Sequence, residues 1–425
     1  MLDYRRLSEL DDKDRSRRVT RDASLEEVQD DVHDILESVR TDGDTALREL
    51  SQELDDVGVE RFDITDQAAE AAKGLDSEVE RAIDTAAERI RSFHQKQVQE
   101  DWMESTDGVV LGRRFRPIDR IGAYVPGGTA AYPSTALMTV IPAKVAGVDE
   151  VVVVTPPAAE QNEVTLAAIH KAGADEIYRI GGAQAIGALA YGTESVDSVK
   201  KIVGPGNRWV AGAKAEVQGD VEIDMIAGPS EVLVLSDETS PPEYVASELL
   251  AQGEHDPHSS VAAVTTNDDH AQKILQATEN QLLDRNRKDI IEQALENEAS
   301  GVFVADSLAG AVEFTEEYAA EHLVVMTEDP REVSARIDNA GSIFLGQYSP
   351  VAAGDYASGT NHVLPTSEKA KVIGGLSVDT FVRAVTIQHL TEDSLLEIAE
   401  PIITLAEAEG LEAHVASVKQ RIDEE

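Results

Sequence analysis

The stretch Ile223–Asp256, IDMIAGPSEVLVLSDETSPPEYVASELLAQGEHD, contains a complete unit of the fold. A Gly-Pro turn comes first, the apolar run Glu231–Leu235 follows, and a segment with helical spacing ends in Gln252-Gly-Glu-His255-Asp. A strand followed by a helix is the repeating unit of a parallel sheet. Gln252 and His255 are three residues apart, so they share one face of the helix terminus and could hold a metal ion, although most such isolated pairs simply face water.

The same alternation continues on both sides of this stretch. From Val109, short β-branched runs alternate with Ala-rich helical patterns, which is typical of βαβ units on a parallel sheet. The pattern predicts an α/β fold with two similar modules. The expected strands are Ile118–Tyr124, Glu150–Thr155, Glu176–Ile180 and Val199–Val203 in the first series, and Glu231–Leu235, Val261–Thr265, Gly301–Ala305, Leu323–Thr327 and Ser342–Leu345 in the second.

Both ends of the chain are predicted to be helical. Leu25–Leu50 and Ala68–Phe93 show helical apolar spacing with charged faces, so residues 1 to about 105 are expected to be mainly helical. From Asp379 the chain is again expected to form helices, including Ser394–Ala408 and a last helix from about Leu411. A C-terminal segment of about 50 residues is small for an independent core, so it should pack on another domain or another subunit.

The composition excludes several classes of protein. The chain has 81 acidic and 37 basic residues, a formal charge of −44, which would repel nucleic acids and anionic membranes. The acidic residues are spread through helical segments, as on the solvated, salt-screened surface of a halophilic protein. No apolar run reaches the roughly 18 residues of a membrane helix, and the polar start has no signal-peptide core, so we expect a cytoplasmic protein. Because there is no cysteine, thiolate metal sites and a cysteine nucleophile are excluded.

Three more polar clusters follow the opening stretch: Glu321-His322, Asp355 to His362, and Glu409 to His414. Together with AGPSEVLVL they closely resemble the signature of the histidinol dehydrogenase family, and the resemblance extends from about Arg116 to the C-terminus. It implies NAD-dependent oxidation of L-histidinol to L-histidine in two steps through the aldehyde, with one Zn²⁺ per subunit. It also implies a homodimer with shared active sites, in which the N-terminal arm and the C-terminal segment cross to the partner.

The resemblance further implies incomplete Rossmann-like modules and a discontinuous first domain. We expect an N-terminal arm over residues 1–20. Residues 21–124 together with 230–374 should form the first α/β domain, with the catalytic residues and most metal ligands. Residues 125–229 should form the second, NAD-binding α/β domain, and residues 375–425 the C-terminal segment.

For the metal, the resemblance selects Gln252, His255, Asp355 and His414. Two imidazoles, a carboxylate and an amide oxygen suit Zn²⁺, and the lack of thiolates favours a site open to substrate. Considered alone, Asp355 is better explained as a turn-former beside Gly354. Five histidines without flanking ligands are expected on the surface or in the core, and His258 is left unassigned; the five are His33, His94, His170, His270 and His389.

Glu321 and His322 are two adjacent proton acceptors at the start of a predicted strand. The resemblance makes His322 the general base and Glu321 the residue that activates water. Without a thiol, the adduct needed to oxidise an aldehyde must come from water, and a carboxylate fits that step. The resemblance also gives substrate contacts, which comprise the metal ligands, His322, and three further residues: Ser230, His362 and Glu409.

Two glycine-rich loops follow predicted strands, Ile180–Gln184 (IGGAQ) and Val203–Asn207 (VGPGN). Each could direct helix N-terminal amides at a phosphate, or be a plain turn, and neither has the full G-x-G-x-x-G spacing. The resemblance assigns NAD contacts to Tyr124 in YVPGG, Gln184 and Asn207.

Three other functions remain open. A related zinc- and NAD-dependent enzyme for another amino or sulfonated alcohol comes first, although His362 and Glu409 argue against it. A zinc hydrolase would use the metal-bound water directly, but the sequence lacks H-E-x-x-H. A dimeric binding protein would have no use for Glu321, His322 and the four ligands together.

Overall fold

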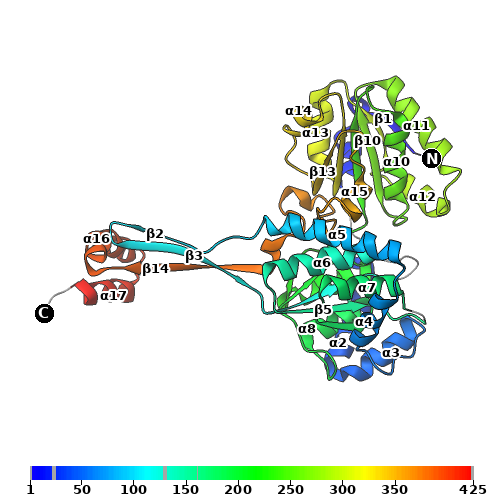
Figure 1. The fold of residues 1–425 in the computed structure, drawn as a ribbon. Helices are drawn as coiled ribbons and strands as arrows, with labels where there is room; N and C mark the ends of the chain where they lie inside the picture. The colour runs from blue at the N-terminus through cyan, green and yellow to red at the C-terminus, as the bar shows by residue number, and fades with distance from the viewer. Residues whose placement is uncertain (1, 22–24, 128–131, 160, 423–425) are drawn as a thin grey trace.

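The computed structural model describes residues 2–21, 25–127, 132–159 and 161–422. Two α/β modules lie against each other, and a long arm that ends in the C-terminal helices extends to one side (Figure 1). The prediction of an α/β fold with two parallel-sheet modules is confirmed. Among the described residues, none of the helices has both the length and the apolar character needed to cross a bilayer.

The first module is built on a six-stranded sheet whose paired strands are all parallel. Along β9, Val232 and Val234 belong to one hydrophobic cluster, and Leu233 and Leu235 to another. Both faces of the strand are therefore covered, which explains why its sequence is a continuous apolar run. In sheet order the strands are β1 (Tyr4–Arg6), β11 (Gly301–Val304), β10 (Ser260–Thr265), β9 (Glu231–Ser236), β12 (His322–Met326) and β13 (Ser342–Leu345). The helices of this part of the chain are α10 (Pro242–Gly253), α11 (Asp268–Leu282), α12 (Lys288–Leu295), α13 (Leu308–Tyr318), α14 (Pro330–Ser334) and α15 (Val351–Tyr356).

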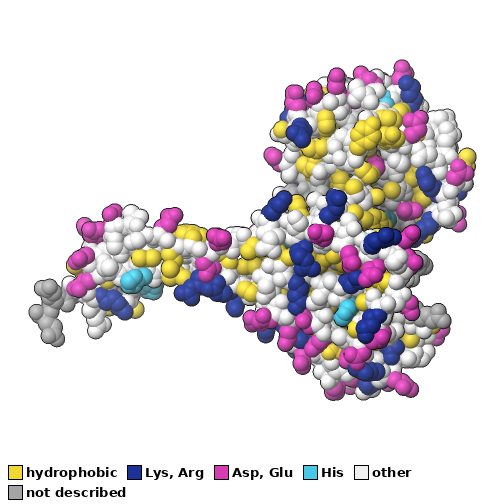
Figure 2. Space-filling model, in the orientation of Figure 1, with side chains coloured by type: hydrophobic (Ala, Val, Ile, Leu, Met, Phe, Trp, Pro, Cys, Tyr) yellow, Lys and Arg dark blue, Asp and Glu magenta, His cyan; other side chains and the backbone are white. Residues whose placement is uncertain are grey.

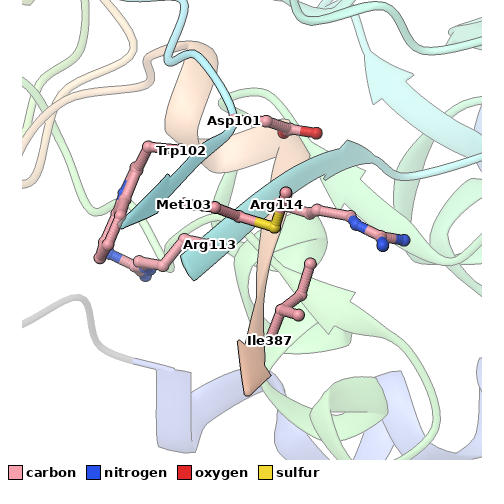
Figure 3. Close-up of a pocket in the computed structure, with 6 residues that line it drawn as sticks. All are labelled: Asp101, Trp102, Met103, Arg113, Arg114 and Ile387. Atoms are coloured by element: carbon pink, nitrogen blue, oxygen red, sulfur yellow. The ribbon is translucent and has the colours of Figure 1, made fainter. Parts of the chain in front are cut away.

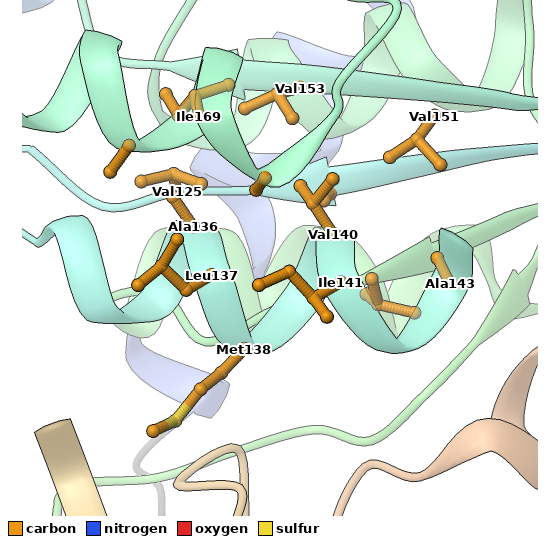
Figure 4. Packing of buried hydrophobic residues seen from close by; sticks show 14 of the residues in the cluster. Val125, Ala136, Leu137, Met138, Val140, Ile141, Ala143, Val151, Val153 and Ile169 are labelled. Carbon is orange, nitrogen blue, oxygen red and sulfur yellow. The ribbon is translucent and has the colours of Figure 1, made fainter. Parts of the chain in front are cut away.

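The second module has a parallel five-stranded sheet, again with a hydrophobic cluster on each side. Figure 4 shows one of them, where Leu137, Val140 and Ile141 pack toward Val151 and Val153. In sheet order the strands are β6 (Glu176–Arg179), β5 (Glu150–Thr155), β4 (Arg120–Tyr124), β7 (Lys201–Val203) and β8 (Glu222–Ile223). Its helices are α6 (Pro133–Ala146), α7 (Glu163–Ala172), α8 (Gly182–Tyr191), α9 (Arg208–Glu216) and η3 (Val217–Gly219).

Four helices from the first quarter of the chain also pack on this second module. They are α2 (Gln29–Asp42), α3 (Asp44–Leu54), α4 (Thr65–Gly74) and α5 (Ser77–Gln95). Helix α2 packs on α8 and α9, α4 on α7, and α5 on α6. The expected grouping of residues 21–124 with 230–374 therefore has to be corrected, because helices α2 to α5 and strand β4 complete the core of the five-stranded module. Their apolar faces predicted burial, but not the sheet that buries them.

The N-terminal residues pack on this chain's own six-stranded sheet. Strand β1 pairs in parallel with β11, and α1 (Asp12–Val19) packs on α13. Two short 3₁₀ turns, η1 (Leu7–Glu9) and η2 (Leu25–Val28), complete this region. The expected arm over residues 1–20, crossing to a partner, is thus corrected for the described residues, since a strand edge in the same chain satisfies its backbone.

A three-stranded antiparallel sheet in the order β14-β3-β2 forms the arm. Its strands are β2 (Trp102–Thr106), β3 (Val109–Pro117) and β14 (Val382–Leu390), and its tip carries α16 (Glu392–Ala408) and α17 (Glu412–Ile422). The expectation that the chain is helical from Asp379 is wrong for β14, because pairing with β3, far away in sequence, decides its conformation. The segment joining α15 to the arm contains η4 (Lys369–Lys371) and η5 (Val378–Phe381).

The arm is apolar on its surface as well as charged. Trp102, Met103, Leu111, Val385 and Leu405 are all exposed there, and Figure 2 shows yellow side chains along it. Acidic side chains are spread over both modules and the arm in the same view, as the sequence predicted. A small hollow on the arm sheet (Figure 3) is lined by Asp101, Trp102, Met103, Arg113, Arg114 and Ile387, and it contains none of the predicted site residues.

Candidate active site

The Glu321-His322 pair lies at the N-terminal end of β12, where the sequence placed it. Both side chains are buried, although both are ionisable. Nδ1 of His322 lies 3.4 Å from Oε2 of Glu321 and 3.0 Å from the backbone oxygen of Glu231. Because both neighbours of Nδ1 are acceptors, we assign the proton to Nδ1, which leaves Nε2 as the nitrogen able to accept a proton.

His322 Nε2 is buried and has no hydrogen-bond partner among the described residues. It lies 3.6 Å from Oδ1 of Asp355, on α15. Burial alone would lower the pKa of His322, but the carboxylates of Glu321 and Asp355 outweigh it and hold this pKa well above its usual range. The same carboxylates make the neutral ring a stronger proton acceptor at Nε2, which suits it to take a proton from a bound substrate.

Three of the four predicted metal ligands belong to the same neighbourhood. Gln252 is buried in the last turn of α10, and its Nε2 has no partner among the described residues. His255 follows the helix end, with its backbone N–H donating to the backbone oxygen of Gln252 at 3.3 Å. Burial raises the pKa of Asp355, but His322, His362 and His255 act in the opposite direction and the net pKa is lowered. Asp355 lies in the short helix α15, and not in the turn that its neighbour Gly354 suggested.

The helix that carries Asp355 is fixed to the helix that carries Gln252. Glu248, one turn before Gln252 in α10, is buried, and its Oε2 accepts the backbone N–H of Val351 at 2.9 Å. Val351 is the first residue of α15. Sequence analysis missed Glu248, although its position four residues before Gln252 placed it on the same helix face.

The fourth predicted ligand is elsewhere. His414 is exposed on α17, at the tip of the arm, and so is Glu409 at the end of α16 (Figure 1). No group of three or more His, Cys, Asp or Glu side chains suited to a metal lies within the described part of the chain. Within one chain, His255 is close enough to Asp355 to act on its charge and Gln252 is on the helix joined to α15, whereas His414 lies elsewhere.

Of the predicted substrate residues, Ser230 and His362 are near the pair. Ser230 precedes Glu231 at the start of β9. Oγ1 of Thr135, on α6 of the other module, lies 3.1 Å from Nε2 of His362. Burial lowers the pKa of His362, and Asp355, His322 and Glu321 are close enough to act on its charge. The candidate site therefore lies where the two modules meet.

The predicted nucleotide residues occupy the second module. Tyr124 ends β4, and its hydroxyl accepts the backbone N–H of Gly182 at 3.2 Å, while burial raises its pKa to about 12. Gln184 is buried, its Oε1 has no hydrogen-bond partner in the part of the chain that the structure describes, and its Nε2 lies 3.4 Å from Oδ2 of Asp55. Asn207 caps α9 by accepting the backbone N–H groups of Trp209 and Val210. The end of the YVPGG motif, Gly128, lies outside the described residues.

A buried ion pair holds the second glycine loop. Lys214 Nζ donates to Oδ1 of Asp224 at 2.5 Å and to the Gly204 oxygen at 3.0 Å, and Oδ2 of Asp224 accepts the Gly204 N–H. Gly204 has φ +105°, and an added Cβ would lie 2.4 Å from the backbone oxygen of Tyr124. The sequence predicted the glycine loop, but it did not predict the Lys214–Asp224 ion pair that holds it.

Comparison with known proteins extends this picture. A family model described as histidinol dehydrogenase matches residues 18–422. The histidinol dehydrogenase of Haloarcula marismortui is 57% identical over 422 residues, which cover 99% of this chain and 100% of that protein. That of Halobacterium salinarum is 56% identical over 425 residues, covering 100% of both. The crystal structure of histidinol dehydrogenase from Elizabethkingia anophelis matches with a TM-score of 0.93 and 38% identity, covering 99% of this chain and 97% of that one.

Proposed function

This chain belongs to the histidinol dehydrogenase family, and from that premise we propose that it oxidises L-histidinol to L-histidine through L-histidinaldehyde with NAD as the oxidant. It is an oxidoreductase of histidine biosynthesis. The observation that carries the proposal is the buried Glu321-His322 pair, with the unpartnered Nε2 of His322 directed at Asp355. A cytoplasmic location fits such a biosynthetic role.

In the proposed reaction His322 takes the proton of the substrate alcohol at Nε2, while its Nδ1 keeps the hydrogen bond to the backbone oxygen of Glu231. In the second step Glu321 draws a proton from the water that adds to the aldehyde. Since the chain has no cysteine, a thiol adduct is not available for this step. Ser230 and His362 are proposed to contact the substrate, and Tyr124, Gln184 and Asn207 the NAD.

The residues present fit one zinc ion per subunit. Gln252 is 2% exposed and Nε2 of its side-chain amide has no partner among the described residues, so no protein group fixes that end of the amide and it can turn its oxygen toward a metal. His255, Asp355 and the His414 of a second chain would complete a set of nitrogen and oxygen donors that zinc accepts. Bound there, zinc would anchor and orient the substrate.

We therefore expect a strong chelator to abolish turnover and added zinc to restore it. His255→Ala should weaken zinc binding by more than the roughly 10- to 100-fold caused by losing a residue that only supports a ligand. His258→Ala is the matched control, because His258 is exposed three residues later and pairs with Asp256. Elemental analysis and chelator competition measure the outcome, and a metal-free protein with full activity would rule the zinc site out.

We also propose a homodimer with shared sites. The arm places Glu409 and His414 away from this chain's own Glu321-His322 pair, and its apolar surface is exposed. Such a surface is typical of a protein interface. A second copy reached by the arm would receive both residues.

The direct test is to incubate the purified protein with histidinol, NAD, zinc and salt and to follow NADH. Two NADH should form per histidinol consumed, because the oxidation removes four electrons. A related enzyme for another alcohol would form NADH with that alcohol but not with histidinol. A protein that forms no NADH from histidinol would overturn the proposed function.

We further propose that the protein is adapted to high salt, as its relatives from Haloarcula and Halobacterium suggest. With a formal charge of −44, the fold should melt at a lower temperature in about 0.01 M KCl than in about 1 M KCl, where the screening length falls from about 30 Å to about 3 Å. Sucrose is the control, because it favours burial without screening charge. A melting temperature that does not change with KCl contradicts the adaptation.

A further inference from the structure

Glu231 of β9 holds both members of the Glu321-His322 pair. Its backbone N–H donates to Oε2 of Glu321 at 2.9 Å, and its backbone oxygen lies 3.0 Å from Nδ1 of His322. Its carboxylate Oε2 accepts the backbone N–H of Glu321 at 3.3 Å. Any displacement of Glu231 therefore moves the water-activating carboxylate and the imidazole of the base together.

Arg21 fixes the carboxylate of Glu231. Nη2 of Arg21 donates to Oε2 of Glu231 at 2.9 Å, and the two side chains are only 7% and 2% exposed. Oε1 of Glu231 accepts the backbone N–H of Ser367 at 2.7 Å. A carboxylate buried this deeply needs a paired charge and hydrogen bonds, so the position of Arg21 determines the position of Glu231.

Arg21 also holds the chain just before the pair. Nη2 of Arg21 donates to the backbone oxygen of Tyr318 at 2.5 Å and lies 3.4 Å from the backbone oxygen of Ala319. The guanidinium lies 4.2 Å from the centre of the Tyr318 ring. Tyr318 is the last residue of α13, and Ala319 has φ +46°, a left-handed conformation that is strained for alanine. Arg21 thus stabilises the turn that directs Glu321 into the site.

We propose that Arg21 and Glu231 are positioning residues, an ion pair brought in by the N-terminal segment that sets the orientation of Glu321 and His322 for both oxidation steps. The inference rests on the proposed function. Neither side chain acts on the substrate itself. Their effect comes through geometry, because a displacement of about 1 Å at reacting groups can lower a rate about 100-fold.

The test compares Arg21→Met, Arg21→Lys and Glu231→Gln in the full-length, zinc-loaded protein. Arg21→Met should lower kcat for alcohol and aldehyde oxidation by about 10- to 100-fold, with KM for histidinol, KM for NAD and zinc content close to those of the wild type. Arg21→Lys keeps the charge and should recover part of kcat. Glu231→Gln keeps the backbone contacts, and the Arg21 charge that it leaves without a carboxylate still has the backbone oxygens of Tyr318 and Ala319 and the Tyr318 ring. It should therefore lower kcat less than Arg21→Met, which removes those contacts as well as the ion pair.

Arg15→Met is the matched control. Arg15 also joins the N-terminal segment to α13, through Nε and Oε2 of Glu317 at 2.6 Å, but within the described residues its side-chain hydrogen bonds reach neither Glu231 nor the Ala319 turn. The kcat of the Arg15→Met variant should equal that of the wild type. To separate positioning from folding, the double variant Arg21→Met/Glu231→Gln removes both charges. Its melting temperature should lie above that of Arg21→Met, whereas its kcat should stay low.

Each outcome decides between the possibilities. Wild-type kcat in folded Arg21→Met protein, or an equal loss in Arg15→Met, overturns the positioning role and leaves the proposed function standing. A raised KM or a lowered zinc content, with kcat unchanged, also overturns the positioning role. So does a double variant in which kcat recovers together with the melting temperature. A wild-type protein that forms no NADH overturns both proposals.

Discussion

Replacing His322 by Asn is expected to lower kcat for both oxidations by about 100- to 10,000-fold, the range attributed to general acid-base catalysis. Asparagine can still donate to the Glu231 oxygen, as Nδ1 of His322 does at 3.0 Å, so the local backbone should be kept. The proton acceptor at Nε2 is lost. Metal content should be unchanged, which elemental analysis checks, and rapid measurement of each step with histidinol and with the aldehyde gives the rates.

Glu321→Gln separates the two steps. Glutamine can accept the Glu231 N–H that Oε2 of Glu321 accepts at 2.9 Å, but it lacks the basic carboxylate that would activate water. The aldehyde step should therefore slow much more than the alcohol step. His33→Asn is the control, because His33 lies on the surface and pairs with Glu216. Undiminished aldehyde oxidation by Glu321→Gln protein would refute the water-activating role.

Two inactive variants should restore activity when they are combined. His414→Ala lacks one proposed ligand but keeps the base, whereas His322→Asn keeps the ligands but lacks the base. If each site takes His414 from the partner's arm, a hybrid dimer has one intact site and one with both lesions. Random pairing makes half of the dimers hybrid, so co-expression should recover roughly a quarter of wild-type activity.

The co-expression experiment also tests the geometry of the arm. The recovery should disappear when both substitutions are in the same chain and that chain is the only one expressed. Mass spectrometry must show that hybrid dimers formed. If hybrids are present without recovered activity, His414 acts in its own chain's site, and the arm of this structure would have to fold back.

Much of the local structure could be predicted because it depends on neighbours in sequence. The apolar run Glu150–Thr155 is β5 with the same bounds, and the expected strand Leu323–Thr327 is β12 (His322–Met326), shifted by one residue. Strand Val382–Leu390 was missed because its partner β3 is far away in sequence. Its conformation is decided by that pairing more than by its own residues.

The candidate site shows the same division. Glu321, His322, Gln252, His255 and Asp355 were all named as candidates from motifs, because the motifs are local patterns of residue type and spacing. Arg21 and Glu231 were not recognised, since they are 210 positions apart and carry no local pattern. Arginine is usually exposed, so only the folded structure shows that Arg21 is buried in an ion pair with Glu231.

By itself, the sequence determined most of the strands and helices, which of their faces are apolar, and which residues are candidates for the chemistry. These properties follow from side-chain periodicity and residue type, which are local. The tertiary structure alone decided that helices α2 to α5 cover the five-stranded sheet, that the N-terminal strand joins the six-stranded one, and that His414 lies on an arm away from His322. An apolar face specifies that it will be buried, but its partner is selected by packing across the whole chain.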